Sequence, residues 1–294
     1  QASSSAASDV YKRQALGYCI AGTILSLVMS ILSKRGDRSI NTATLFTTLT
    51  DFSNQREFTP FLQNDFIDAI ESEAYDKGIL ESFIIARTFS FLRSNDLIYS
   101  PAIKSYMMGE APPSFDLLFW NGDGSNLPCK MAVQYLRYLC QDNQFAKNEL
   151  EMFEETIGAA DIETPIFAVS CETDHIASWK DSFRGLQNFS SKEKTFVLSE
   201  AGHVAGIVNA PGSGKYGYYF GKGEYEDAEQ WKNGAEFEKE SWWPFWEGWL
   251  REKSKDLVEA RIPKAEFDLD LGDAPGHYVH PVSYTHLRAH ETAS

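Results

Sequence analysis

Three short stretches most constrain how this chain can fold, because each follows directly on a run of strand-like residues. They are 17–22 (GYCIAG), 173–175 (TDH) and 201–203 (AGH). Their reactive side chains, Cys19, Asp174 and His203, come in the chain order of nucleophile, acid and histidine in α/β hydrolases. That order predicts an α/β-hydrolase fold in which these three side chains form a catalytic triad.

The setting of each side chain suits acyl transfer. Cys19 lies between the small residues Gly17 and Ala21 at the start of an apolar helix, where the peptide dipoles favour an anion. An imidazole such as His203 can take the thiol proton and return it to a departing thiol, while Asp174 fixes the imidazole tautomer. We expect the backbone N–H of Ile20 to be one oxyanion-hole donor. The pattern thus predicts attack of Cys19 on a thioester.

Simpler interpretations of the same residues remain open. Asp174 could cap the helix that is expected from Ser178, and His175 could be the functional histidine instead of His203. A Gly-x-Cys-x-small pattern also arises by chance. The order of the three side chains, each directly after a strand-like run, favours the triad.

An alternation of strand-like and helical segments surrounds these stretches. It predicts helices at 20–33, 131–139, 178–187 and 241–250, and strands at 40–49, 115–120 and 166–170, with a final strand at 195–198. Between 52 and 114 the alternation stops, and helical segments at 66–75 and 79–91 lead into an aromatic stretch. We interpret 52–114 as an inserted cap.

Composition and charge exclude several classes of protein. With 294 residues, 43% of them hydrophobic, the chain has material for one large core. A net charge of −15 argues against nucleic acid as a partner. Its four cysteines show no metal-binding spacing and no dense disulfide framework, so we expect no metal site and a reducing cytoplasm. The uncharged run 15–32 could be a signal peptide or membrane anchor, but its glycine, serine and threonine content favours a buried helix.

The two ends of the chain resemble translated sequencing adapters. Residues 4–14 and 282–292 look like the transposon-end adapters of short-read libraries, so we exclude 1–14 and 282–294 from the fold. The native part, 15–281, is then expected to be a partial α/β-hydrolase domain without its first sheet strands and second oxyanion donor. Loss of one such donor costs about a hundred- to a thousandfold in rate. We therefore expect this exact chain to be inactive or poorly folded.

Four segments carry a resemblance to a known family. They are 119–128 (FWNGDGSNLP), 89–97 (FSFLRSNDL), 202–209 (GHVAGIVN) and 241–244 (SWWP). Together they resemble the polyhydroxyalkanoate synthases, and most closely the class I enzymes. The resemblance extends over nearly all of 17–279. One departure is Ala21, at a position where many nucleophile turns have glycine; we expect it to be tolerated.

The resemblance implies polymerisation of (R)-3-hydroxyacyl-CoA into polyester with release of coenzyme A. Cys19 would carry the growing chain as a thioester and His203 would activate it, with Asp174 helping to activate the monomer hydroxyl through His203. Trp120 and Asp123 match residues that line or support the pocket. Coenzyme A enters as part of the substrate, and no cofactor is implied. We expect the protein to lie in the cytoplasm, at the surface of polymer granules. We also expect it to form a homodimer and to have no membrane segment.

Two other functions stay open. A Cys-His-Asp hydrolase, such as a thioesterase or a dienelactone-hydrolase-like enzyme, would share the triad and release free hydroxy acid. A non-catalytic granule-associated protein would bind polymer without needing Cys19.

Overall fold

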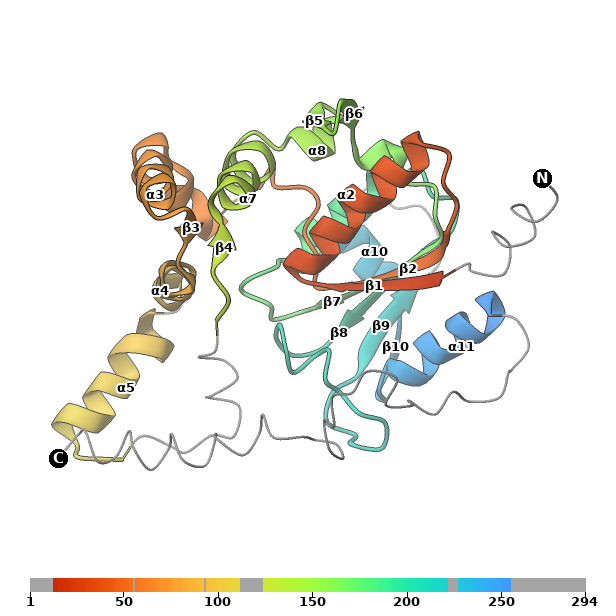
Figure 1. Ribbon diagram of the computed structural model, residues 1–294. Coiled ribbons are helices and arrows are strands. Elements are labelled where there is room, and N and C mark those ends of the chain that lie inside the picture. Colours follow the sequence, from red (N-terminus) through yellow and green to blue (C-terminus); the bar gives the residue numbers. More distant parts are fainter. Residues whose placement is uncertain (1–12, 55, 93, 112–123, 222–226, 255–294) are drawn as a thin grey trace, which may run out of the picture. The chain divides into compact units, whose positions relative to one another are not determined.

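The computed structural model describes residues 13–54, 56–92, 94–111, 124–221 and 227–254 (Figure 1). The chain divides into two compact units, which we describe separately. The first comprises the described residues up to Ser72 and from Lys130 onward, and the second those from Glu73 to Cys129.

The first unit is built on a six-stranded mixed sheet. Its strands are β1 (Arg13–Tyr18), β2 (Ile40–Phe46), β7 (Ile166–Cys171), β8 (Lys194–Ser199), β9 (Tyr218–Gly221) and β10 (Glu236–Glu238), neighbours in that order. The first four are parallel, and β9 and β10 continue the sheet antiparallel. Parallel neighbours joined through helices are the hallmark of α/β folds, which confirms the predicted fold class.

Helices cover both faces of this sheet (Figure 1). On one face, α2 (Ile20–Lys34), α9 (Trp179–Gln187) and α10 (Ala228–Gly234) enclose a core in which the Trp231 ring packs edge-on against Phe196. On the other, α11 (Trp243–Lys253) covers a second core. Because both faces are covered, the central strand β7 is buried along its whole length.

Helix α2 agrees with the prediction to within one residue at its end. Small side chains, Gly22, Thr23, Ser26 and Ser30, form much of its buried face, which lets the helix approach the sheet closely. In the described part of the chain, no helix is both long and apolar enough to cross a membrane. Strand β1 begins at Arg13, two residues before the expected start of the native part.

The segment between β2 and β7 supplies the other elements of the first unit. They are η1 (Arg56–Leu62), α3 (Asn64–Lys77), α7 (Cys129–Gln134), η4 (Tyr135–Gln141), α8 (Gln144–Lys147), β5 (Leu150–Met152), β6 (Glu155–Ile157) and η5 (Ala159–Asp161). The helix expected at 131–139 is present as the α-helix α7 followed by the π-helix η4. α3 and α7 each cross the division between the units.

The second unit is mostly helical. It contains β3 (Ile79–Leu80), α4 (Ser82–Leu92), η2 (Asn95–Tyr99), α5 (Ser100–Ala102), η3 (Ile103–Met107) and β4 (Leu127–Pro128), with β3 and β4 paired antiparallel. The strand expected at 115–120 lies outside the described residues. The cap boundaries 52–114 stay a prediction.

The prediction of a final strand at 195–198 is half right. β8 is there, but it is followed by β9, whose Ser199↔Tyr218 to Phe196↔Gly221 register continues the sheet, and by the edge strand β10. The sequence around β9 is rich in glycine, which is typical of a loop, and the three residues of β10 are all exposed. Neither strand therefore shows the alternation of apolar and polar residues that marks a half-buried strand.

Candidate active site

Cys19 lies at the sharp turn between β1 and α2. Its φ of 54° and ψ of −124° are strained for a residue with a side chain, and such strain persists only where the surroundings hold it. Here its backbone N–H donates to the Phe46 carbonyl at the end of the neighbouring strand, at 2.8 Å. The turn therefore presents the thiol at the carboxyl edge of the sheet, as a nucleophile turn requires.

Two glycines make this turn possible. A Cβ on Gly17 would stand 2.5 Å from the Gly22 backbone, and a Cβ on Gly22 would stand 1.9 Å from Oγ1 of Thr48. Both distances are far inside van der Waals contact. Ala21, by contrast, is exposed. The structure thus gives a reason why alanine is tolerated at 21 while glycine stands at 17 and 22.

Asp174 and His203 meet just beyond the ends of β7 and β8. The Nδ1 of His203 and Oδ2 of Asp174 are 2.7 Å apart, and the Asp174 side chain is fully buried. The other carboxylate oxygen, Oδ1, accepts the backbone N–H groups of Ile176 and Ala177 at 2.8 and 2.9 Å. Asp174 thus fixes the imidazole with one oxygen and its own loop with the other.

Cys19 and Asp174 both act on the His203 ring. Burial by itself favours the neutral imidazole, but hydrogen bonds and charge interactions with Asp174 and Cys19 outweigh it and raise the pKa of His203 to about 9. The imidazole therefore interacts with both a buried carboxylate and a thiol. In this geometry one ring nitrogen is held by Asp174, which leaves the other for proton exchange with Cys19.

The loop that carries His203 is anchored by the start of α11. The indole N–H groups of Trp242 and Trp243 donate to the carbonyls of Gly206 and Ile207, each at 2.9 Å. A Cβ on Gly206 would stand 2.5 Å from the sulfur of Cys171, so the loop packs closely on β7. The tryptophans are prominent in the sequence, but nothing in it shows that their N–H groups hold this loop.

Tyr18, which sequence reasoning missed, also contacts His203. Its hydroxyl donates to the His203 carbonyl at 2.9 Å, and its ring meets the imidazole edge-on with centroids 5.3 Å apart. The only signal in the sequence is its place directly before Cys19.

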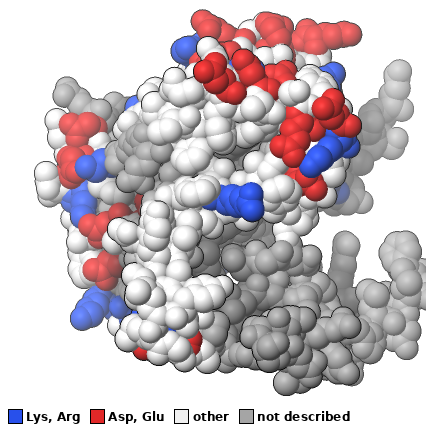
Figure 2. Space-filling view, turned by 90° about the vertical axis from the view of Figure 1, so that its left-hand side faces the viewer, with Lys and Arg blue, Asp and Glu red and all other residues white. Residues whose placement is uncertain are grey.

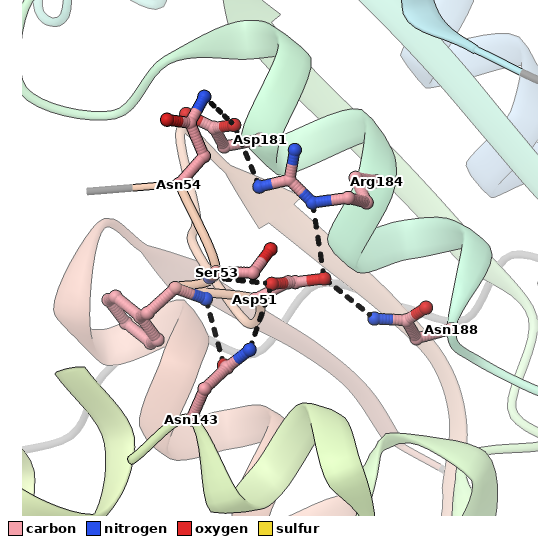
Figure 3. Close-up of polar contacts among 8 residues, drawn as sticks. Asp51, Ser53, Asn54, Asn143, Asp181, Arg184 and Asn188 are labelled. Atoms are coloured by element: carbon pink, nitrogen blue, oxygen red, sulfur yellow. Dashed lines mark hydrogen bonds and ion pairs between the residues drawn. The ribbon is translucent and has the colours of Figure 1, made fainter. Parts of the chain in front are cut away.

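Asp51 forms a polar cluster in the segment after β2 (Figure 3). Its carboxylate accepts from the Ser53 backbone N–H, Asn143 Nδ2, Arg184 Nε and Asn188 Nδ2 at 2.9 to 3.2 Å. Burial opposes ionisation, but these hydrogen bonds and the Arg184 charge hold the pKa of Asp51 below its ordinary value. The cluster ties this segment to α9, so it stabilises the framework around the candidate site.

The sequence-predicted site residues therefore divide into two groups. Cys19, Asp174 and His203 come together at one edge of the sheet, and Ile20 is the first residue of α2, where helical N–H groups lack intrahelical acceptors. Trp120 and Asp123 lie outside the described residues. The sequence offers His175 as an alternative to His203 for the catalytic histidine. His203 is the one that bonds to Asp174, so it is the histidine that fits a triad.

Charges on the surface agree with the net charge. Figure 2 shows acidic side chains gathered at the top of the face in view, as expected for a net charge of −15. Within the described residues, no group of three or more histidine, cysteine or acidic side chains is placed to hold a metal ion.

Several curated proteins are similar to this chain over most of its length. Poly(3-hydroxyalkanoate) polymerase subunit PhaC of Rhizobium meliloti is 37% identical over 265 residues, which are 90% of this chain and 43% of that protein. The poly(3-hydroxyalkanoate) polymerase of Methylorubrum extorquens is 36% identical over 90% of this chain and 44% of its own length. The chain is homologous to a part of these polymerases. It spans less than half the length of the two polymerases.

A polymerase with lower identity is similar over nearly the same share of the chain. Poly(3-hydroxyalkanoate) polymerase subunit PhaC of Cupriavidus necator is 32% identical over 91% of this chain and 46% of its own length. No protein-family model matches the chain. The similarity to the polymerases confirms the family that the sequence segments suggested.

Solved structures give weaker similarities. A monoacylglycerol lipase of Paleococcus ferrophilus is 17% identical, with 65% of this chain and 60% of that chain covered and a TM-score of 0.35. The Vlm2 thioesterase domain is 16% identical, with coverages of 70% and 67% and a TM-score of 0.34. The fold assignment therefore rests on the strand order of this chain itself.

Proposed function

We propose that this chain carries the acyl-transfer site of an enzyme that polymerises (R)-3-hydroxyacyl groups from their coenzyme A thioesters into polyester. The observation that carries the proposal is the His203 imidazole, which bonds to buried Asp174 and interacts with Cys19 at a strained turn. The polymerase names of the relatives supply the substrate class.

The first step would load the enzyme. The Cys19 sulfur attacks the thioester carbonyl while His203 takes the thiol proton, and the backbone N–H of Ile20 donates to the oxyanion. Collapse of this intermediate forms the acyl–Cys19 thioester and breaks the bond to the coenzyme A sulfur. The proton on His203 passes to that sulfur, so coenzyme A leaves as a thiol and the histidine is regenerated.

The second step would lengthen the polymer. The 3-hydroxyl of another acyl unit attacks the carbonyl of acyl–Cys19, and its proton passes to His203. An ester bond forms, the bond to Cys19 breaks, and the thiolate recovers its proton from His203. Asp174 holds the imidazole orientation and stabilises the imidazolium in both steps. Water competing with the hydroxyl would give hydrolysis instead, so the site should exclude water.

The resemblance to the polymerases supports further proposals about the pocket, the cofactor requirement, the oligomeric state and the location. Trp120 and Asp123 would line or support the pocket, and no cofactor would be needed beyond the coenzyme A of the substrate. The working protein would be a homodimer at the surface of a polymer granule in the cytoplasm.

A chimera tests this function. Residues 15–281 would replace the matching region of the Rhizobium meliloti polymerase, and the chimera and the 294-residue chain would each receive (R)-3-hydroxybutyryl-CoA. We expect the chimera to release coenzyme A and form insoluble polyester, and the isolated chain to be inactive or poorly active. Cys19→Ala should abolish the reaction in the chimera, and Cys129→Ala, a change in the second unit, should not. Soluble hydroxy acid as the product would favour a hydrolase, and granule binding without turnover a non-catalytic role.

A further inference from the structure

Tyr18 joins the nucleophile turn to the histidine loop. It is the last residue of β1, so its backbone continues directly into Cys19. Its hydroxyl reaches across to donate to the His203 carbonyl at 2.9 Å. Its ring lies at 65° to the imidazole, with centroids 5.3 Å apart. One side chain thus contacts both the backbone and the ring of His203.

We propose that Tyr18 is a positioning residue that holds the His203 imidazole where it reaches both Asp174 and Cys19. This inference rests on the proposed function, because it concerns the same three side chains. Tyr18 takes part in no chemical step and acts only through His203.

The need for such a contact follows from where the loop is otherwise held. Trp242 and Trp243 fix the carbonyls of residues 206 and 207, three and four residues beyond the histidine. On the other side of the histidine, the carbonyls of Ala201 and Gly202 accept the backbone N–H groups of Thr173 and Gly206 at 3.0 and 2.9 Å. None of these bonds involves the carbonyl of His203 itself. The Tyr18 hydroxyl bonds that carbonyl, and the edge-on ring contact restricts rotation of the imidazole.

The Tyr18 hydroxyl stays a donor over the useful pH range. Burial, with the nearby charges of Cys19 and Asp174, raises the pKa of Tyr18 well above its ordinary value of 10. The phenol therefore keeps its proton while His203 titrates near pH 9. Its bond to the histidine loop should not change across that titration.

Alkylation of Cys19 by iodoacetamide tests the inference in the 294-residue chain without any polymer chemistry. The rate at Cys19, followed by peptide mass spectrometry from pH 6 to pH 10, reports how well His203 assists the thiol. In Tyr18→Phe we expect the rate at pH 7 to fall about fivefold, the size of the loss of one hydrogen bond. The pKa of His203, followed by NMR, should move from about 9 toward 6.5.

Tyr218→Phe is the matched control. Tyr218 lies in β9 of the same sheet and donates its hydroxyl to Glu238 at 2.7 Å, so the change also removes one hydroxyl hydrogen bond. We expect it to leave Cys19 alkylation within twofold of the unsubstituted chain. In a His203→Ala background, Tyr18→Phe should have no further effect on the rate.

Several results would overturn the inference. One is a rate of Cys19 alkylation in Tyr18→Phe that equals the rate in Tyr218→Phe. Another is a Tyr18→Phe effect on that rate that is just as large in the His203→Ala background. If Tyr18→Phe does not fold, a ring-fluorinated tyrosine at position 18 keeps the donor and nearly the same size. It should retain the rate within twofold at pH 7, and a larger loss there would also contradict the inference. If Tyr18→Phe slows Cys19 alkylation as expected but the chimera makes no polyester, the result would count against the proposed function and not against the role of Tyr18.

Discussion

Asp174 binds His203 with one carboxylate oxygen and the backbone of its own loop with the other. The 2.7 Å contact to Nδ1 and the two bonds from Ile176 and Ala177 leave the carboxylate well satisfied although it is fully buried. A buried carboxylate with these donors is an effective fixed charge beside the imidazole. The raised pKa of His203 depends on it.

Asp174→Asn should therefore lower the pKa of His203 from about 9 toward 6.5. The amide keeps the size of the side chain but removes the charge that favours the imidazolium. Titration of the His203 ring by NMR measures the change. Asp227→Asn, which alters the N-cap of α10, should leave the titration unchanged. A His203 pKa that stays near 9 in Asp174→Asn would show that another group supports the imidazolium.

The same interaction sets a pH dependence of stability. The pKa of His203 is higher in the folded protein than its ordinary value of 6.5, so protonation favours folding. This contribution is fully present below about pH 6.5 and is lost as the pH rises through about 9. Urea unfolding of the unsubstituted chain and of His203→Gln should differ most at pH 6 and converge by about pH 10. A difference that grows with pH would contradict this sign.

Gly22→Ala should destabilise the chain by about 1–3 kcal/mol, the usual effect of forcing extra volume into a packed site. The new Cβ would stand 1.9 Å from Oγ1 of Thr48, so the nucleophile turn must shift. Gly248→Ala in α11 is the control, because its Cβ meets no atom within 4 Å and alanine favours helix. Thermal unfolding compares the two, and equal effects would mean that the turn is not tightly packed.

Trp242→Phe should loosen the histidine loop. It removes the indole donor to the Gly206 carbonyl, which still accepts the Ser199 hydroxyl at 2.9 Å, so the expected cost is about 0.5–1.5 kcal/mol. Trp249→Phe is a close control in the same packed face, because the buried Trp249 N–H has no hydrogen-bond partner within the described structure. Hydrogen exchange should rise at residues 203–209 in Trp242→Phe only. Equal exchange in both variants would contradict the anchoring role.

Asp51→Asn should cost about 1–3 kcal/mol at pH 7, since it weakens a buried carboxylate cluster that includes Arg184. The pKa of Asp51 is below its ordinary 3.8, so its stabilisation is present above about pH 4 and is lost as the pH falls through the lower native value. Glu247→Gln, which breaks an exposed pair with Arg251, should change stability by less than about 0.5 kcal/mol. Urea unfolding at pH 7 and pH 3 checks both.

Much of the framework could be predicted because its signals are local. The apolar spacing of α2 and the branched residues of β2 mark their elements without reference to the rest of the chain. The order of Cys19, Asp174 and His203 then placed all three at one sheet edge, because parallel strands end on the same side.

Other features depend on contacts that no local pattern shows. β9 and β10 form because β8 offers a free edge, and their own sequences look like loop. The hydroxyl of Tyr18 meets a carbonyl 185 residues away, and the indoles of Trp242 and Trp243 bond a loop some 36 residues before them. Such pairings follow from the tertiary fold.

The acyl-enzyme is the most direct test of the account. The chimera would be exposed briefly to (R)-3-hydroxybutyryl-CoA, quenched in acid and digested, and the acylated peptide would be located by mass spectrometry. We predict the acyl group on Cys19, and its loss in His203→Ala. An acyl group on another residue, or a chimera that makes polyester with Cys19 replaced by alanine, would contradict the central claim.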